Sequence, residues 1–222
     1  MSQTFPLLRA FLFDLDGTLI DSKVDLVASV NAMLRQMGRP ELPTGIVATY
    51  IGHGAPQLIA SALGPGASDD QQRTGLSLFL AHYGLHKLDA TRPYPGVVEA
   101  LDSLSSFPMS VLSNKPTNMS VEILQGLGLA KYFRSIYGGD SFEKKKPDPT
   151  GALKILQEFG VSPAQAAMVG DSEVDVQTAR NAGTLAVAVN YGFGVHDRDA
   201  YPADLYLDSL TELAGLTRNR RP

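Results

Sequence analysis

The sequence predicts an α/β fold in which a doubly wound, Rossmann-like parallel sheet carries an inserted helical cap. Beyond residue 92, short apolar segments alternate with segments of helical periodicity, which indicates parallel strands joined by right-handed crossovers. The short segments are mainly apolar, as expected of a sheet buried on both faces. Between residues 22 and 92, directly after the first predicted strand, the periodicity is helical throughout.

The first strand and the helical insert follow from the chain in order. Residues 10–13 form an apolar run that predicts a buried strand ending at Asp14. Ser22 and Asp25 have the spacing of a capping box, so we expect a helix to begin there and to end near Gly38. Further helices are expected at about residues 44–63, with an interruption at Gly52-His53-Gly54, and at about residues 69–83.

The segment Arg92-Pro-Tyr-Pro-Gly96 marks the return to alternating strands and helices. Glycines follow several of the predicted helices, where a left-handed residue commonly ends a helix. Strands are predicted at residues 109–112, 135–137, 166–169, 185–189 and 205–207. Helices are predicted at residues 97–107, 117–127, 150–159, 173–182 and about 209–216.

Composition narrows the class of protein. The chain has 222 residues, a net charge of −4 and a sequence pI of about 5.5, so it lacks the basic surplus typical of proteins that bind nucleic acid or anionic membranes. It contains no cysteine, which excludes disulfide scaffolds, thiolate metal sites and cysteine catalysis. No apolar run has the length of a membrane span, and the N-terminal segment does not have the pattern of a signal peptide. We therefore expect a cytoplasmic protein.

Two carboxylates, Asp14 and Asp16, follow the first strand. Carboxyl ends of parallel strands form the usual ligand site of such sheets, and neighbouring carboxylates repel each other unless a cation neutralises them. Hard oxygen ligands favour Mg²⁺. An EF-hand is excluded, because its glycine and its closing glutamate would fall on Leu19 and Asp25. A solvated acidic turn remains the alternative for this motif taken alone.

Three later segments place polar side chains near the same edge of the sheet. Ser113, followed by Asn114 and Lys115, ends a strand and suits a phosphate oxygen, although a helix cap would explain Ser113 equally well. Lys146 precedes a rigid Pro-x-Pro segment, whereas Lys144 and Lys145 are expected at the surface. Asp171 and Asp175 follow another predicted strand. They are four residues apart, so we expect them to share one face of the helix that begins there.

Taken together, these four segments resemble the four motifs of the haloacid dehalogenase-like hydrolases, in order and over essentially the whole chain. The resemblance implies a catalytic core at residues 1–20 and 93–222 and a helical cap at residues 21–92. It also implies phosphoryl transfer through an aspartyl-phosphate. A carboxylate at Asp16 argues for a phosphatase or mutase, since the dehalogenase branch lacks a carboxylate at this position.

The resemblance assigns roles to individual residues. Asp14 would be the nucleophile and Asp16 the general acid and base. Ser113 and Lys146 would bind the phosphate oxygens. Asp14, the Asp16 backbone carbonyl and Asp171 would coordinate Mg²⁺. Asp175 would hold a metal-bound water or orient Lys146. Thr18 and Asn114 would bind the substrate.

Several stretches resemble bacterial phosphoglycolate phosphatases in particular. They are residues 50–56, 93–97, 113–116, 138–140 and 191–194. We expect the cap loop Gly52-His53-Gly54 to face the substrate, although His53 could equally be a surface residue. Ser113 replaces the threonine common in that subfamily, and Lys23 stands where we expect a small residue.

The expected partner is a small phosphorylated metabolite, with 2-phosphoglycolate favoured, and the expected oligomeric state is a monomer or homodimer. A broad sugar-phosphate phosphatase or a β-phosphoglucomutase-like enzyme would share every motif residue. A non-catalytic phosphate-binding module is the alternative from another class of protein. Only substrate turnover separates the first two alternatives from the favoured enzyme, whereas loss of activity in Asp14→Asn with retained ligand binding would favour an enzyme over the module.

Overall fold

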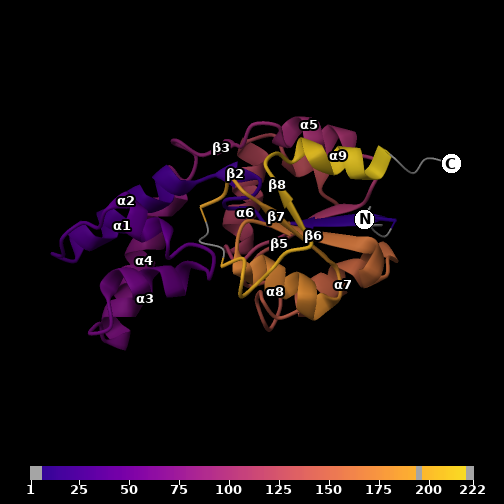
Figure 1. Ribbon diagram of the computed structural model, residues 1–222. Helices are drawn as coiled ribbons and strands as arrows, with labels where there is room; N and C mark the ends of the chain where they lie inside the picture. The colour runs from indigo at the N-terminus through magenta and orange to yellow at the C-terminus, as the bar shows by residue number, and fades with distance from the viewer. Residues whose placement is uncertain (1–6, 194–196, 219–222) are drawn as a thin grey trace.

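The computed structural model describes residues 7–193 and 197–218, so Gly194 lies outside the described residues. Figure 1 shows a sheet with helices above and below it, and a separate group of helices that projects to one side. This arrangement confirms the predicted α/β fold with a parallel sheet and an inserted helical block.

All six strands of the main sheet are parallel, in the order β5-β4-β1-β6-β7-β8. Strand β1, the first in sequence, therefore lies near the middle, between β4 and β6. In register, Phe13 stands between Val111 and Val169. The strands are β1 Ala10–Phe13, β4 Met109–Leu112, β5 Ser135–Tyr137, β6 Ala166–Gly170, β7 Leu185–Val189 and β8 Leu205–Leu207. Because β1 is central, the residues that follow it lie at the middle of the carboxyl edge.

Helices cover both faces of this sheet. Side chains of α5, α6 and α9 join one buried cluster with one face of the strands, and side chains of α7 and α8 join another cluster on the opposite face. Figure 1 shows α5 and α9 on one side of the sheet and α7 and α8 on the other. Their bounds are α5 Val97–Ser103, α6 Thr117–Gly126, α7 Thr150–Phe159, α8 Glu173–Ala182 and α9 Thr211–Arg218.

The cap consists of four helices that pack mainly on one another. Helix α1 packs along α4, and α3 packs against α4. Buried aromatic side chains of α4, Phe79 and Tyr83, are stacked with their ring centroids 5.5 Å apart. The helices are α1 Lys23–Gln36, α2 Thr44–Ala48, α3 Ala55–Leu63 and α4 Asp69–His86.

Two short antiparallel strands connect the cap to the core. They are β2 Ile20–Asp21 and β3 Arg92–Pro93, paired through Ile20 with Pro93 and Asp21 with Arg92. The sequence gives no strand signal for such two-residue segments, so they were not predicted. The pairing brings the two ends of the insert together, so the cap leaves and re-enters the core at one place.

The predicted capping box at the start of α1 is wrong. Ser22 stands at the N-cap position, but its hydroxyl makes no cap bond and donates instead to Asp16. Asp25 is buried and accepts hydrogen bonds from the N–H groups of Ala90 and Thr91 and from the Thr91 hydroxyl, at 2.7–3.1 Å. Both side chains thus join segments distant in sequence, because tertiary partners compete successfully with the local cap.

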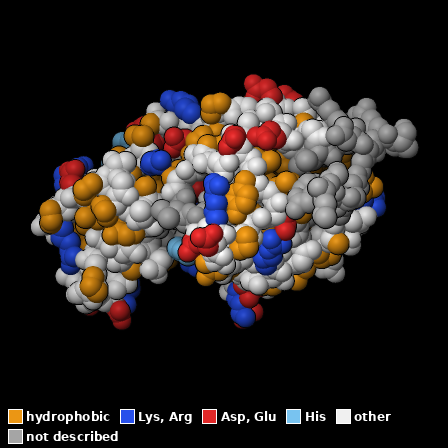
Figure 2. All heavy atoms as spheres, in the orientation of Figure 1, with side chains coloured by type: hydrophobic (Ala, Val, Ile, Leu, Met, Phe, Trp, Pro, Cys, Tyr) orange, Lys and Arg blue, Asp and Glu red, His pale blue; other side chains and the backbone are white. Residues whose placement is uncertain are grey.

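Cationic and anionic side chains are interspersed on the face of the molecule shown in Figure 2. Among the described helices, none combines the length and the apolar character that crossing a membrane requires.

Candidate active site

The carboxyl ends of β1, β4 and β6 bring the predicted motif residues together. Asp14 follows β1, Ser113 follows β4, and Asp171 follows β6. The Asp14 N–H donates to the Val169 carbonyl at 2.8 Å, so the sheet ladder continues to the residue that carries the first carboxylate. The backbone of a buried sheet, rather than a loop, fixes the position of this carboxylate.

Lys146 lies between two carboxylates. Its Nζ is 2.8 Å from Asp14 Oδ1 and 2.6 Å from Asp175 Oδ1, and the side chains of all three residues are at least nine-tenths buried. The Asn114 amide donates to the Lys146 carbonyl at 3.1 Å and holds the backbone from which this lysine extends. The structure therefore gives Lys146 a fixed position, unlike an ordinary solvated lysine.

Burial and the neighbouring opposite charge have opposite effects on the pKa values of Asp14 and Lys146. Burial raises the pKa of Asp14 to about 6, with a smaller increase from the charge of Asp175, while the Lys146 ammonium works in the opposite direction. Burial lowers the pKa of Lys146, but the charges of Asp14 and Asp175 more than offset this, and its pKa lies above the ordinary value. Lys146 therefore stays charged, and its ammonium faces an Asp14 carboxyl whose pKa is raised.

Asp175 has two sets of contacts. Its Oδ1 binds Lys146, and its Oδ2 accepts from the Ser172 N–H at 3.2 Å and the Ser172 hydroxyl at 2.7 Å. Helix α8 begins at Glu173, so the expectation that Asp171 and Asp175 share one helix face is wrong: Asp171 precedes the helix. Helix capping and the orientation of Lys146 are both performed by Asp175.

Asp171 is held by the loop that follows β7. Its Oδ2 accepts from the Phe193 N–H at 3.0 Å. Gly17 packs against it closely enough that a Cβ at this position would lie 2.1 Å from Asp171 Oδ2, and Gly17 has a φ of +85°. A glycine is therefore required where the motif loop passes over this carboxylate.

The residues present fit a divalent cation. Carboxylate oxygens of Asp14, Asp171 and Asp175 all lie within 4.8 Å of one another, and all three residues are buried. The charges of the site do not cancel, because four carboxylates face two ammonium groups: Asp14, Asp16, Asp171 and Asp175 against Lys115 and Lys146. With all carboxylates ionised, the excess of two negative charges and the hard oxygen donors suit an ion such as Mg²⁺.

Asp16 binds a lysine that sequence reasoning did not select. Lys115 Nζ lies 2.8 Å from Asp16 Oδ2, and it donates to the hydroxyl of the cap residue Tyr83 at 2.8 Å. The Lys115 side chain is 4% exposed, so this ion pair is almost fully removed from solvent. Its place two residues beyond the end of a buried strand, directly after Ser113 and Asn114, was the available signal.

Asn114 and Thr18, the two predicted substrate-binding residues of the core, make contacts outside the carboxylate cluster. The Asn114 amide donates to the Gly52 carbonyl of the cap at 3.0 Å, so Asn114 joins cap and core. Thr18 is fully buried, and its carbonyl accepts from the Tyr191 hydroxyl at 2.9 Å. Thr18 is not among the residues that line the cavity described below, and its buried hydroxyl has no hydrogen-bond partner among the described residues.

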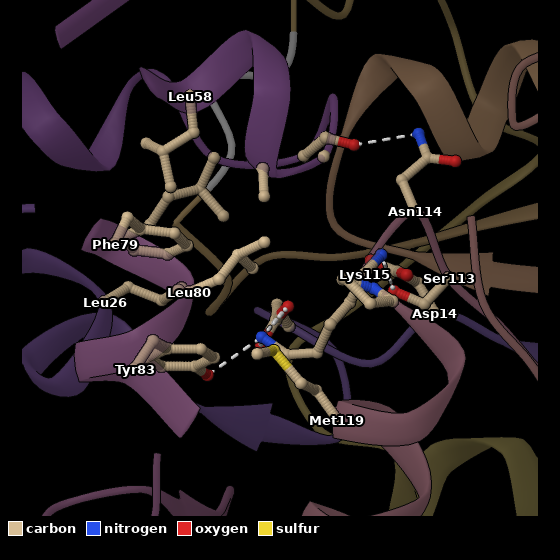
Figure 3. A pocket seen from close by; sticks show the side chains of 16 residues that line it. Asp14, Leu26, Leu58, Phe79, Leu80, Tyr83, Ser113, Asn114, Lys115 and Met119 are labelled. Atoms are coloured by element: carbon tan, nitrogen blue, oxygen red, sulfur yellow. Dashed lines mark hydrogen bonds and ion pairs between the residues drawn. The ribbon is translucent and has the colours of Figure 1, made fainter. Parts of the chain in front are cut away.

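A cavity of about 40 Å³, measured as the space open to the centre of a water molecule, lies between the cap and these residues (Figure 3). Its core side presents carboxylate, hydroxyl, amide and ammonium groups, whereas its cap side is mostly apolar. The lining residues used below are Asp14, Asp16, Leu26, Leu58, Phe79, Leu80, Tyr83, Ser113, Asn114, Lys115 and Met119.

The cap loop at residues 52–54 borders the cavity through its glycines. Gly54 has a φ of +89°, and a Cβ there would lie 3.0 Å from the Asn114 carbonyl oxygen. His53 is not among the lining residues; its carbonyl accepts from Lys145 Nζ at 2.6 Å. Lys145 is exposed, as expected, yet it contacts the cap. Lys23 lies elsewhere, with its Nζ 5.2 Å from the centre of the Phe193 ring.

Comparison with known proteins identifies the family. The model of the haloacid dehalogenase-like hydrolases matches residues 11–189, so the chain belongs to this family. The resemblance inferred from the four motifs is thereby confirmed.

Similar proteins identify a narrower group within this family. A phosphoglycolate phosphatase of Pseudomonas putida is 40% identical over 223 residues, covering 95% of this chain and 81% of its own. A phosphoglycolate phosphatase of Chromobacterium violaceum is 37% identical over 218 residues, covering 96% of this chain and 97% of its own. The crystal structure of a predicted phosphoglycolate phosphatase from Haemophilus somnus has a TM-score of 0.88 and 28% identity, covering 97% of this chain and 100% of its own. The protein is a phosphatase of the phosphoglycolate phosphatase-like group.

Proposed function

We propose that this phosphatase is a Mg²⁺-dependent phosphomonoesterase that forms a phosphorylated Asp14 and acts preferentially on 2-phosphoglycolate, releasing glycolate and phosphate. The main support is the buried contact of Lys146 with Asp14 and Asp175, beside the cluster of carboxylate oxygens. A carboxylate held rigidly beside a cation, at the carboxyl edge of the sheet, is positioned to attack a phosphorus atom. The names of the relatives support the choice of substrate.

The first half of the reaction forms the aspartyl-phosphate. An Asp14 carboxylate oxygen attacks phosphorus, while the Asp16 carboxyl donates its proton to the departing alkoxide oxygen. An alkoxide is a poor leaving group, and a positioned acid typically contributes roughly 10²–10⁴ in rate. Lys146 and Ser113 bind phosphate oxygens and thereby stabilise the charge that develops on them.

The second half hydrolyses the intermediate. Asp16, now ionised, takes a proton from the attacking water, and Asp14 is regenerated. Bound Mg²⁺ would polarise the phosphate and reduce its repulsion from Asp14, with Asp14, Asp171 and the Asp16 carbonyl as its protein ligands. Asp175 keeps Lys146 in place throughout.

In this proposal residues 1–20 and 93–222 form the catalytic core and residues 21–92 the cap. The cap covers the reacting groups and limits the access of bulk water. Glycines of its 52–54 loop border the bound substrate, whereas His53 contributes a backbone carbonyl to the contact with Lys145.

The test is phosphate release from 2-phosphoglycolate, sugar phosphates and nucleotides, with Mg²⁺ and with chelator. We expect Mg²⁺-dependent release with a preference for 2-phosphoglycolate, and loss of release in Asp14→Asn. Asp70→Asn is the matched control, because the Asp70 side chain is 87% exposed on the cap. Broad, weak release would discard the substrate but keep the chemistry. An active Asp14→Asn variant would refute the nucleophile, and no release from any ester would favour a mutase or a binding module.

A further inference from the structure

The cap side of the cavity has few groups that could bind a hydroxylated leaving group. Leu26, Leu58, Phe79 and Leu80 project into it from the cap, and Met119 borders it from α6 (Figure 3). A buried hydroxyl without a hydrogen-bond partner is unfavourable. Sugars and other polyols would therefore lose water against this wall without gaining equivalent partners.

Lys115 is the one basic side chain among the described residues that line this cavity. Its ammonium lies where the apolar wall meets the polar floor, in contact with Asp16 and with the Tyr83 hydroxyl (Figure 3). An ammonium has three N–H donors, and three oxygens lie within 3.0 Å of this one: both carboxylate oxygens of Asp16 and the Tyr83 hydroxyl. A substrate carboxylate would therefore bind by taking the place of one of the two Asp16 oxygens. Lys146, by contrast, lies beneath Asp14 between two carboxylates.

The chemistry of the leaving group connects Lys115 with the substrate. In the proposed mechanism the ester oxygen lies beside Asp16, which protonates it. In 2-phosphoglycolate the carboxylate is attached to the very carbon that carries this oxygen. A group so close to the ester oxygen comes within reach of the ammonium that contacts Asp16. A neutral leaving group of the same size would place no charge there.

We propose that Lys115 binds the carboxylate of the leaving group, so that the cavity selects phosphate esters of small hydroxy acids over neutral or polyhydroxylated esters. This inference rests on the proposed function and deepens it by naming the residue that recognises the acid. Lys115 binds one side of the carboxylate, and the apolar wall accommodates the hydrocarbon part. Two features thus act together: the ammonium attracts an anion, and the wall disfavours extra hydroxyl groups.

The experiment compares two esters that differ in the carboxylate alone, 2-phosphoglycolate and ethyl phosphate. Lys115→Met removes the ammonium, and because Lys115 also contacts Asp16, kcat should fall for both esters. The informative quantity is the ratio of the two kcat/KM values, which cancels that common loss. We expect wild-type protein to favour 2-phosphoglycolate, and the ratio to fall about tenfold or more in Lys115→Met, as for a lost charged hydrogen bond.

Controls separate recognition from folding. Lys144→Met removes an exposed lysine near the site and should leave the ratio unchanged, since the Lys144 side chain is 68% exposed. Lys115→Gln serves as a second variant if Lys115→Met does not fold, and it should lower the ratio in the same way. Tyr83→Phe keeps the ammonium and should retain the preference.

An unchanged ratio in an active Lys115 variant would overturn the inference while leaving the phosphatase mechanism intact. Equal kcat/KM for the two esters in wild-type protein would do the same, without any mutation. Failure of wild-type protein to release phosphate from any ester would instead contradict the proposed function itself. The two failures are therefore distinguishable in one set of assays.

Discussion

Lys146→Met tests how strongly the buried ammonium holds the site together. The substitution keeps an unbranched side chain one atom shorter than lysine but leaves Asp14 and Asp175 facing each other without the cation that contacts both at 2.6–2.8 Å. Removing one partner from a buried ion pair costs about 3–5 kcal/mol. We therefore expect the free energy of unfolding to fall by roughly that amount at pH 8 in the presence of chelator.

The loss of stability in Lys146→Met should depend on pH, and the pKa of Asp14 decides whether it grows or shrinks as pH rises. Its pKa in the folded wild-type protein is about 6, above the ordinary value of 3.8, so the folded state binds the proton more tightly than the unfolded state. A raised carboxyl pKa means that stability is lost as pH rises from about 4 to about 6. Without Lys146 the pKa rises further, and this loss continues to higher pH. The cost of the substitution should accordingly be smaller at pH 5 than at pH 8.

Urea denaturation of wild-type and variant protein at both pH values measures the effect. At pH 8 the midpoint should move by about 1 M or more, given slopes of roughly 1–3 kcal/mol per M. Lys144→Met is the control: its ion pair with Asp148 is 3.7 Å long and the Lys144 side chain is 68% exposed, so the cost should stay below about 1 kcal/mol. An equal cost at pH 5 and pH 8, or no cost at either, would refute the reasoning.

Three further predictions follow from single contacts. The affinity for Mg²⁺, measured by calorimetry, should weaken as pH falls below about 6, because protons then compete for Asp14; a constant affinity down to pH 5 would contradict this. Asp25→Asn should destabilise the protein by about 1–3 kcal/mol in urea denaturation, because an amide cannot accept all the hydrogen bonds that Ala90 and Thr91 donate. Gly17→Ala should abolish phosphate release, since its Cβ would lie 2.1 Å from a carboxylate oxygen of Asp171; full activity would show that the motif loop moves freely.

The sequence was sufficient for the layout of the fold. Alternation of mainly apolar and helical segments predicts the six parallel strands, because the strand segments are short and mostly apolar and several helices are followed by a glycine that ends them. The carboxyl ends of β1, β4 and β6 then had to meet, which gathers Asp14, Ser113 and Asp171. These inferences need only local patterns and the handedness of crossovers.

Contacts between segments that are distant in the chain could not be predicted from the sequence. The spacing of Ser22 and Asp25 satisfies the local rule for a helix cap, yet both side chains bind residues from other segments. The two-residue strands of the hinge carry too few residues for any periodicity. Lys115 was named beside Ser113 but not selected, because only the fold brings Tyr83 and Asp16 to it.

The groups that carry the chemistry also hold the cap. Asn114 donates to the Gly52 carbonyl and to the Lys146 carbonyl, and Lys115 contacts both Tyr83 of the cap and Asp16 of the core. Opening the cap must therefore break hydrogen bonds made by the same side chains that border the reacting groups. A ligand that binds between Lys115 and Asp14 changes the partners available to these side chains, so occupancy of the site and the position of the cap are energetically linked. This linkage is built from the residues that follow a single strand, β4.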